Sequence, residues 1–223
     1  GLEPDEALVD LVQKLALGRK TEQFVSLCGQ LRFQRRWSQS PRVPETSVLG
    51  HMLTVAVLSY MCSRRFTTCE RRRYNNFYGG LFHDLPEVLT RDIASPIKSA
   101  VEGLDSIIKE YERKQMEERV LPLIPHGWRG ELRYFTEDEF ANRALDENGQ
   151  IRRGLSYSEI NERYDADRFR PVDGRMLKGC DDLSAFVEAC LSCEHGIRSK
   201  HLTVGIRRLT AQSAGKQING LDF

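Results

Sequence analysis

The chain has 223 residues, of which 40% are hydrophobic and 29% are charged, and its formal net charge at pH 7 is +1. This composition is ordinary for a globular protein with one sizeable core, and the near-neutral charge argues against a protein built mainly to hold a nucleic-acid polymer. The longest apolar stretch, residues 48–62, contains His51 and is shorter than the ~20 residues that span a bilayer. The acidic N-terminus lacks the basic segment of an export signal. We therefore expect a cytoplasmic protein that does not contact a membrane.

Apolar residues recur at helical spacing through most of the first half of the chain. The helix that follows Ser47 is apolar nearly all round, which predicts a central and buried position. Residues 95–125 form one long or broken amphipathic pattern that ends at a proline, and the prolines of 38–47 indicate a loop. The helices predicted before residue 95 cover residues 5–17, a stretch capped by Thr21 that ends near "RRW" (35–37), the stretch from Ser47 to about Ser63, and a stretch from Tyr74 with Phe77, Tyr78, Leu81 and Phe82 facing inward.

Residues 126–172 are polar and interrupt the helical pattern. Within them, "ENGQ" (147–150) favours a hairpin with a two-residue turn, and "SYSE" (156–159) is a capping box for a short helix. The helical pattern resumes at about residue 173 and ends with residues 197–213. The sequence therefore predicts an all-α protein, a single domain over residues 1–223 with an irregular insertion at about 126–172.

The cysteines lie mostly within apolar helical patterns, which is typical of buried free thiols in a reducing compartment. A zinc knuckle at Cys190-x-x-Cys193-x-His195 is an alternative, but no second Cys/His pair follows it. Free thiols are the expected state. The six cysteines are Cys28, Cys62, Cys69, Cys180, Cys190 and Cys193.

Three predicted apolar helices each carry polar groups that are costly to bury. His51 lies in the middle of one, His83 and Asp84 adjoin in the next, and Asp181 lies within the late helix. Each group alone is explained as a hydrogen-bonded core residue, because buried polar groups need partners. Together they favour another explanation, since imidazole and carboxylate groups are the ligands that a divalent cation recruits. Two His and two Asp also leave coordination positions open, as catalytic sites do.

The residues after this His-Asp pair predict a break in the helix. Pro86 disfavours a helical residue before it, so the helix should kink or restart directly after Asp84. Residues 79–80 are both glycine and lie one turn before His83, where missing side chains let another helix approach closely. Glu87 follows about one turn later and suits a general acid/base, although the helix dipole alone also favours a glutamate there.

Arg36 and Trp37 follow a predicted helix and precede the proline-bearing loop. A guanidinium can pair bidentately with a phosphate, and an indole can pack against a sugar or base. Taken alone, Trp37 is more readily explained as a core residue.

Four sequence features occur in a fixed order along the chain: "RRW" (35–37), His51, "FHDLPEVLTRDIASPIK" (82–98) and "KGCDDLSAF" (178–186). This set resembles that of HD-domain metal-dependent phosphohydrolases, and within them it is similar to the YfbR-like bacterial 5′-deoxynucleotidases. The resemblance covers roughly residues 21–125 and 173–193, and it implies a helical HD-domain bundle. The metal ligands that it implies are His51, His83, Asp84 and Asp181, with Asp182 as an alternative for the last. The other roles that it implies are catalysis for Glu87 and substrate binding for Arg36, Trp37 and Asp92, with Trp37 near the 2′ position of the sugar.

The expected activity is that of a divalent-metal-dependent phosphomonoesterase, which removes the 5′ phosphate from (deoxy)nucleoside monophosphates. Two alternatives stay open: hydrolysis of another small phosphate ester or nucleotide at the same site, and a non-catalytic sensor that binds a metal or nucleotide. The resemblance also implies a homodimer. The sequence leaves the identity of the single divalent ion open among Mn, Co, Zn, Fe, Ni and Mg.

Overall fold

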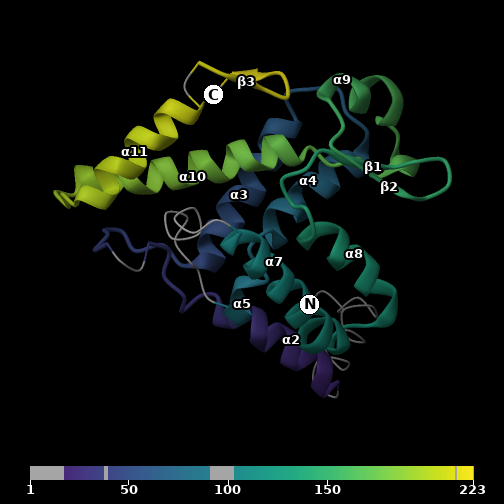
Figure 1. Ribbon diagram of the computed structural model, residues 1–223, viewed down its shortest axis with the longest axis horizontal. Helices are drawn as coiled ribbons and strands as arrows, with labels where there is room; N and C mark the ends of the chain where they lie inside the picture. Colours follow the sequence, from purple (N-terminus) through teal and green to yellow (C-terminus); the bar gives the residue numbers. More distant parts are fainter. Residues whose placement is uncertain (1–17, 38–39, 91–102, 214, 223) are drawn as a thin grey trace, which may run out of the picture.

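The computed structural model describes residues 18–37, 40–90, 103–213 and 215–222. Within them the chain is an assembly of helices with two small two-stranded sheets, which confirms the predicted all-α class (Figure 1). None of the described helices is both long enough and apolar enough to span a bilayer. The predicted helix over residues 5–17 and the predicted substrate contact Asp92 lie outside the described residues.

The helices, in chain order, are α2 (Arg19–Gln30), α3 (Val48–Ser63), α4 (Glu70–Phe82), α5 (Glu87–Thr90), α7 (Leu104–Gln115), η1 (Met116–Val120), η2 (Leu121–Leu123), α8 (His126–Thr136), α9 (Tyr157–Glu159), η3 (Ile160–Tyr164), η4 (Asp167–Phe169), α10 (Gly174–Glu194) and α11 (Lys200–Ser213). The antiparallel strand pairs are β1 (Arg143–Leu145) with β2 (Ile151–Arg153), and β3 (Gln217–Ile218) with β4 (Leu221–Asp222).

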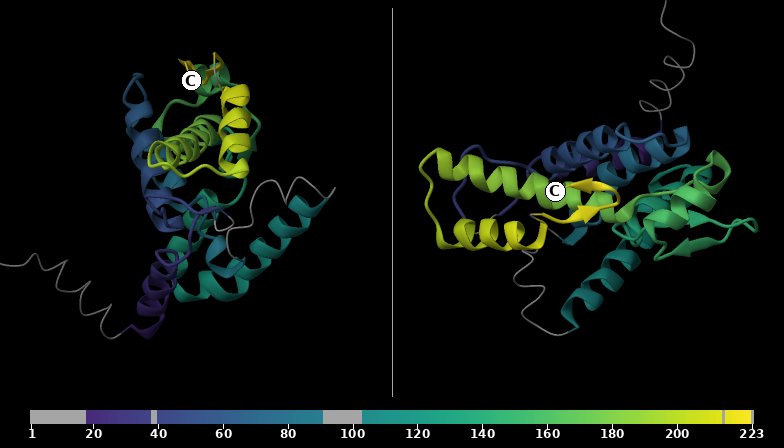
Figure 2. Two further views of the ribbon diagram at one scale, coloured as in Figure 1. Left: turned by 90° about the vertical axis from the view of Figure 1, so that its left-hand side faces the viewer. Right: turned by 90° about the horizontal axis from the view of Figure 1, so that it is seen from above.

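Helix α3 is the centre of the fold, as its apolar sequence predicts. Ser47 caps it by accepting a hydrogen bond from the backbone N–H of Gly50 at 3.0 Å. The helix packs against both α4 and α10, while α11 turns back alongside α10 (Figure 2). The end of the molecule away from β3 contains α2, α5, α7 and α8 (Figure 1).

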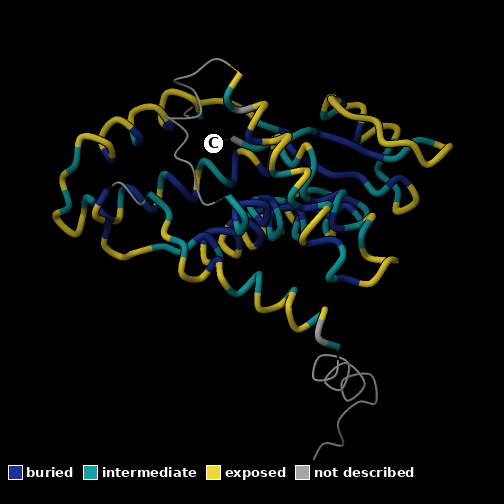
Figure 3. The backbone as a smooth tube through the Cα atoms, turned by 60° about the horizontal axis from the view of Figure 1, so that its bottom comes forward, coloured by how far each residue is buried: buried dark blue, intermediate teal, exposed yellow. Residues whose placement is uncertain are grey.

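Two apolar clusters hold these helices around α3. Val55 joins Met176 and Cys180, which fastens α3 to α10. Figure 3 shows the resulting distribution, with the buried positions on the central helices and the exposed ones on the periphery. The larger cluster joins α3, η1, η2 and α8 with residues that directly follow α2, α4 and η2, and it consists of Leu31, Val48, Met52, Leu85, Met116, Val120, Leu121, Ile124 and Leu132.

Helix α4 differs from its prediction, because its most buried face carries glycines and polar residues. The aromatic residues expected to face inward are only half-buried. The close approach of α3 explains the glycines, since a Cβ at Gly80 would lie 2.9 Å from the Cα of Ala56. The fully buried residues of α4 are Arg72, Asn75, Asn76, Gly79 and Gly80.

Arg72 fastens the insertion (residues 126–172) and the start of α10 to this helix. Its Nε and Nη2 donate to the two carboxylate oxygens of Asp173 at 2.8 and 2.7 Å. Its Nη1 donates to Oδ1 of Asn161 at 2.8 Å, and Asn76 donates to Asp173 at 2.8 Å. A buried guanidinium is tolerated here because its charge meets a buried carboxylate in bidentate geometry.

The insertion is more ordered than its sequence predicts. It begins with α8, an 11-residue helix that the polar composition did not indicate. The predicted two-residue turn is wrong, because the last strand pair is Leu145 with Ile151 and the connection is longer. In it the carboxylate of Asp146 accepts from the backbone N–H groups of Asn148 and Gln150, both at 2.9 Å. The capping box from Ser156 is confirmed.

The predicted cap of α2 and the predicted burial of the cysteines both differ from the structure. Helix α2 begins at Arg19 with Gly18 at the cap position, so Thr21 does not cap it. All six cysteines are free thiols as predicted, but only Cys180 is buried and the other five are half-buried.

Candidate metal centre

The small residues of α3 and α4 bring the two predicted histidine ligands together. The helices cross in contact at Ala56 and Gly80, so no side chain separates them there. His51 lies somewhat more than one turn before this crossing on α3, and His83 lies about one turn after it, directly beyond α4. Their ring centroids are 5.4 Å apart.

Helix α10 supplies the carboxylate that completes this group. One ligand atom each from His51, His83 and Asp181 lies within 4.8 Å of the others. Nε2 of His51 is 3.0 Å from Oδ1 of Asp181. Asp84 is beside them, with Oδ2 at 3.2 Å from Nε2 of His83 and 3.8 Å from Nε2 of His51. The structure therefore brings the four predicted metal ligands together.

The alternative last ligand, Asp182, shares Lys178 with Asp181, but within the described residues only Asp181 also contacts His51. Asp182 accepts a hydrogen bond from Nζ of Lys178 at 2.9 Å. The same ammonium group donates to the other oxygen of Asp181 at 2.7 Å, which leaves Oδ1 of Asp181 directed at His51. The orientation of α10 therefore distinguishes Asp181 from Asp182 as the proposed ligand, which their spacing in the sequence does not.

The hydrogen bonds of the histidine rings fit a bound cation. Nδ1 of His83 donates to the carbonyl oxygen of Gly80 at 2.7 Å, so Nε2 faces the cluster. That Nε2 atom is buried, and its partner is Oδ2 of Asp84, which lies 3.2 Å away in an ion pair. A metal ion held by both atoms would take the place of the proton between them. Donor atoms that share one ion at ~2.1 Å must lie about 3 Å or more apart, as these do.

Opposite charges in the cluster shift the pKa values of its acidic and basic groups so that the charged forms are favoured. Burial alone would raise the pKa of Asp84, but His83 and the Arg36 guanidinium hold it well below its usual range. Burial would likewise raise the pKa of Asp181, but a hydrogen bond from His51 and the charge of Lys178 hold it well below that range. Burial lowers the pKa of His83, yet the Asp84 carboxylate outweighs it and raises the value to about 9. The two aspartates are therefore ionised at neutral pH, and a cation would replace the proton on His83.

Arg36 stands beside the ligand group, and its predicted role in phosphate binding stays a prediction. Its Nη1 is 3.3 Å from Oδ2 of Asp84, and its Nη2 is 3.7 Å from Oδ1 of Asp181. Glu87 is the first residue of α5, where the chain restarts as a helix after Pro86, and its side chain is buried. Both residues line the cavity next to the cluster.

Trp37 is placed differently from its neighbour. It is not among the described residues that line the cavity. Its indole instead lies against α11, where a Cβ at Gly205 would come within 2.7 Å of the ring. The backbone of Trp37 has a φ of 56°, a left-handed conformation that is unfavourable for a bulky residue. The role of Trp37 in sugar selection stays a prediction.

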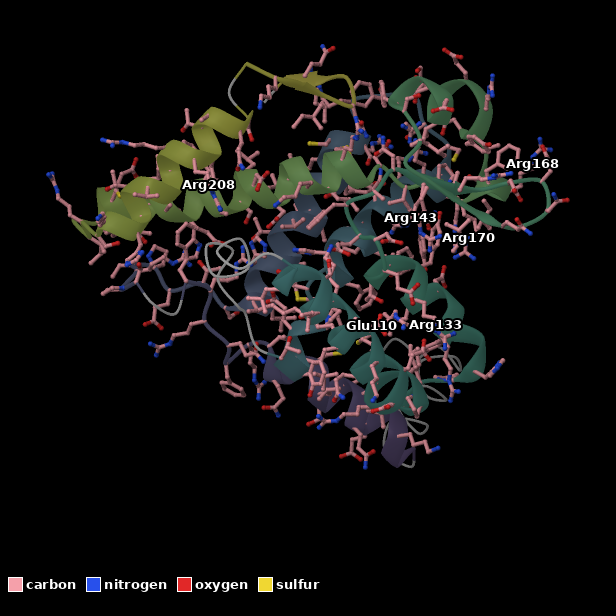
Figure 4. All side chains as sticks on the ribbon, in the orientation of Figure 1. Glu110, Arg133, Arg143, Arg168, Arg170 and Arg208 are labelled. Atoms are coloured by element: carbon pink, nitrogen blue, oxygen red, sulfur yellow. The ribbon has the colours of Figure 1, made fainter. Side chains whose placement is uncertain are left out.

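The cavity has a volume of about 620 Å³. His83, Asp84 and Asp181 contribute to its wall, so the candidate metal centre is open to it. Such a volume lies within the range of small-molecule sites, ~300–1,000 Å³. Figure 4 shows Arg133 on α8 and Arg208 on α11, two of the cationic side chains that line the cavity from different elements. The other cationic residues of the lining are Arg36, Lys109, Arg113 and Lys178.

One buried acidic residue of the site, Glu188, is not among the residues predicted from the sequence. Its Oε1 is 3.2 Å from Nδ1 of His51, on the side of the ring away from Asp181. Ser184 is also there, with Oγ at 3.1 Å from the same nitrogen. The signal was present, because Asp181, Ser184 and Glu188 recur at the spacing of one helix face.

Comparisons with known proteins identify the family of the chain. The sequence model of the HD domain family matches residues 28–210. A 5′-deoxynucleotidase of Shewanella oneidensis is 25% identical over 118 residues, which are 51% of this chain. The chain spans 59% of the length of that relative in the match.

A solved structure shares the fold. The crystal structure of an HD-domain phosphohydrolase from Listeria innocua aligns with a TM-score of 0.62 at 16% identity. The alignment covers 86% of this chain and 78% of the other.

Proposed function

The chain belongs to the HD domain family, and from that premise we propose that it is a divalent-metal-dependent phosphohydrolase that removes the 5′ phosphate from (deoxy)nucleoside monophosphates. One observation carries the proposal: two imidazoles and two carboxylates from α3, from the turn after α4 and from α10 converge beside a cavity of about 620 Å³. The resemblance to a 5′-deoxynucleotidase supports the choice of substrate.

The proposed metal ligands are His51, His83, Asp84 and Asp181. A divalent cation bound there would act as a Lewis acid on the phosphoryl group and lower the pKa of a coordinated water. The chain's own task is to hold that ion with two neutral imidazoles and two ionised carboxylates. Their opposite charge suits a cation, and their mixed nitrogen and oxygen donors suit several transition metals.

Arg36 and Glu87 are the proposed partners of the substrate. A guanidinium carries five N–H donors, so Arg36 can stay near Asp84 and still present N–H groups to phosphate oxygens. Glu87 is a buried carboxylate on the cavity wall, where it can accept a proton from water or give one to the leaving sugar oxygen. The predicted contacts of Trp37 and Asp92 with the sugar belong to the same proposal.

The proposal is tested by phosphate release from chelator-treated protein. Purified protein is stripped of metal and supplied with Mn²⁺, Co²⁺, Zn²⁺, Fe²⁺, Ni²⁺ or Mg²⁺. Each sample then receives a panel of nucleoside monophosphates, diphosphates and sugar phosphates. We expect release from the monophosphates only with added cation, and none from His83→Ala. Release confined to other esters would replace the substrate, whereas stoichiometric cation binding without any release would favour the sensor alternative.

We also propose a homodimer in the cytoplasm. Helices α3 and α10, which pack against each other, both expose apolar side chains at helical spacing. Exposed apolar side chains on two packed helices suit an interface, and a two-fold contact would cover them on both copies. Val57→Glu should therefore convert dimers to monomers in sedimentation experiments, whereas Val25→Glu on α2 should not. A wild-type monomer would refute this. The exposed residues are Leu53, Val57 and Met61 of α3, and Leu183, Val187 and Leu191 of α10.

A further inference from the structure

A buried carboxylate lies behind the first histidine of the candidate metal centre. Glu188 is 9% exposed, Arg42 is 5% exposed, and His51 is completely buried. Neither Glu188 nor Arg42 is among the described residues that line the cavity. A substrate in the cavity would therefore not touch them.

The two oxygens of Glu188 hold two different parts of the chain. Oε1 lies 3.2 Å from Nδ1 of His51, and Oε2 accepts a hydrogen bond from Nη1 of Arg42 at 2.9 Å. An ionised carboxylate only accepts hydrogen bonds, so with a cation bound at Nε2 the ring proton of His51 would be on Nδ1, facing Glu188. Nε2 is then the atom that faces Asp181 at 3.0 Å. Glu188 thus sets which nitrogen of His51 is available to a cation.

The partner of the other oxygen belongs to the loop that carries Arg36. Arg42 comes just after the strained residue Trp37, and its guanidinium lies 5.9 Å from the centroid of that indole. The loop closes on itself, because the backbone N–H of Arg36 donates to the carbonyl of Thr46 at 2.9 Å. The ion pair between Arg42 and Glu188 therefore joins this loop to α10.

We propose that Glu188 is a positioning residue with two tasks: it orients His51 toward the metal ion, and through Arg42 it fixes the loop that presents Arg36 to the phosphate. The inference rests on the proposed metal centre. Carboxylates that hold a ligating histidine commonly change metal affinity by ~10–100-fold when they are removed. Glu188 couples this ligand with the phosphate-binding loop through a single side chain.

The test compares four variants of the full chain by titration with Co²⁺. Glu188→Gln retains the size of the side chain but removes its charge, and it should weaken Co²⁺ binding by ~10–100-fold. It should also change the visible absorption of the bound Co²⁺, since the orientation of His51 changes. Glu188→Asp restores the charge and should recover part of the affinity. Ser192→Ala is the matched control, because Ser192 is buried on the same helix and its Oγ makes no hydrogen bond in the described part of the chain.

Arg42→Gln separates the second task from the first. It leaves Glu188 beside His51, so Co²⁺ affinity should stay near the wild-type value. Release of the loop should raise KM for the nucleotide by about tenfold, which corresponds to ~1.4 kcal/mol of binding.

Two results would overturn the inference. If Glu188→Gln binds Co²⁺ with wild-type affinity and spectrum, Glu188 does not position His51, and the proposed metal centre still stands. If the wild type binds no cation, both the inference and the proposed function are wrong. A Glu188→Gln protein that does not fold is replaced by Glu188→Asp, whose carboxylate is one methylene shorter and should weaken Co²⁺ binding measurably while Ser192→Ala does not.

Discussion

Gly80→Ala tests whether the close contact of α3 and α4 builds the metal centre. In the structure a Cβ at Gly80 would lie 2.9 Å from Cα and 3.0 Å from N of Ala56. These are backbone atoms of a buried helix, so no flexible side chain can move aside. Carbon atoms in contact prefer about 3.5 Å or more, so the helices must separate by roughly 0.6 Å. Overpacking of this kind costs ~1–3 kcal/mol, against a gain of up to ~1 kcal/mol from replacing glycine in a helix.

The expected net effect is a loss of ~1–2 kcal/mol in the free energy of unfolding of the metal-free protein. A shift of 0.6 Å also exceeds the ~0.2 Å within which metal–ligand distances are held, so Co²⁺ should bind more weakly as well. Urea denaturation gives the first quantity, and titration with Co²⁺ gives the second.

Gly130→Ala provides the matched control. Gly130 is in α8, and a Cβ there would meet no atom within 4 Å in the described part of the chain. That variant should be as stable as the wild type or up to ~1 kcal/mol more stable. If Gly80→Ala behaves like Gly130→Ala, the two helices are not held in contact at this crossing, and the account of how the histidines meet is wrong.

Three other predictions concern the buried ion pair, the pH dependence and the proposed catalytic residue. Arg72→Met leaves the carboxylate of Asp173 buried without its bidentate partner and should lower the free energy of unfolding by ~3–5 kcal/mol in urea; a loss below ~1 kcal/mol would contradict the buried pair. The Asp84 carboxylate outweighs burial and raises the pKa of His83 to about 9. Protonated His83 therefore stabilises the metal-free protein fully below about pH 6.5, and this stabilisation is lost as the pH rises through about 9. For the same reason cation binding should release a proton, and cation affinity should increase with pH up to about 9. Calorimetry in buffers of different ionisation enthalpy measures both, and an affinity that is constant from about pH 7 to about pH 9 would refute the prediction. Glu87→Ala should reduce kcat by ~10²-fold or more with Co²⁺ affinity unchanged, whereas loss of cation binding would make Glu87 a ligand.

The helices that carry the proposed ligands were largely predictable. Helix α3 is apolar all round and begins at a serine cap, so its position and its bounds follow from the sequence. The restart of the chain as α5 follows from Pro86, which cannot donate a backbone hydrogen bond. In both cases local chemistry and tertiary packing favour the same structure.

The remaining features depend on contacts between distant residues. The buried face of α4 is polar because Arg72 and Asn76 meet Asp173, 97 or more positions later, which no local pattern reveals. Helix α8 contains Gly127 and Gly130, which lowered its helical signal. The choice between Asp181 and Asp182 depends on the contact of Asp181 with His51, since Lys178 donates to both carboxylates.

Cation-dependent phosphate release is the measurement that tests the central claim most directly. Chelator-treated protein is titrated with Mn²⁺ in the presence of a deoxynucleoside 5′-monophosphate, and free phosphate is measured at each addition. The account predicts no release at the start and a rise that saturates at one ion per chain, with no rise in His83→Ala. Release from the untitrated protein, or from His83→Ala at the wild-type rate, would contradict a reaction centred on these four ligands.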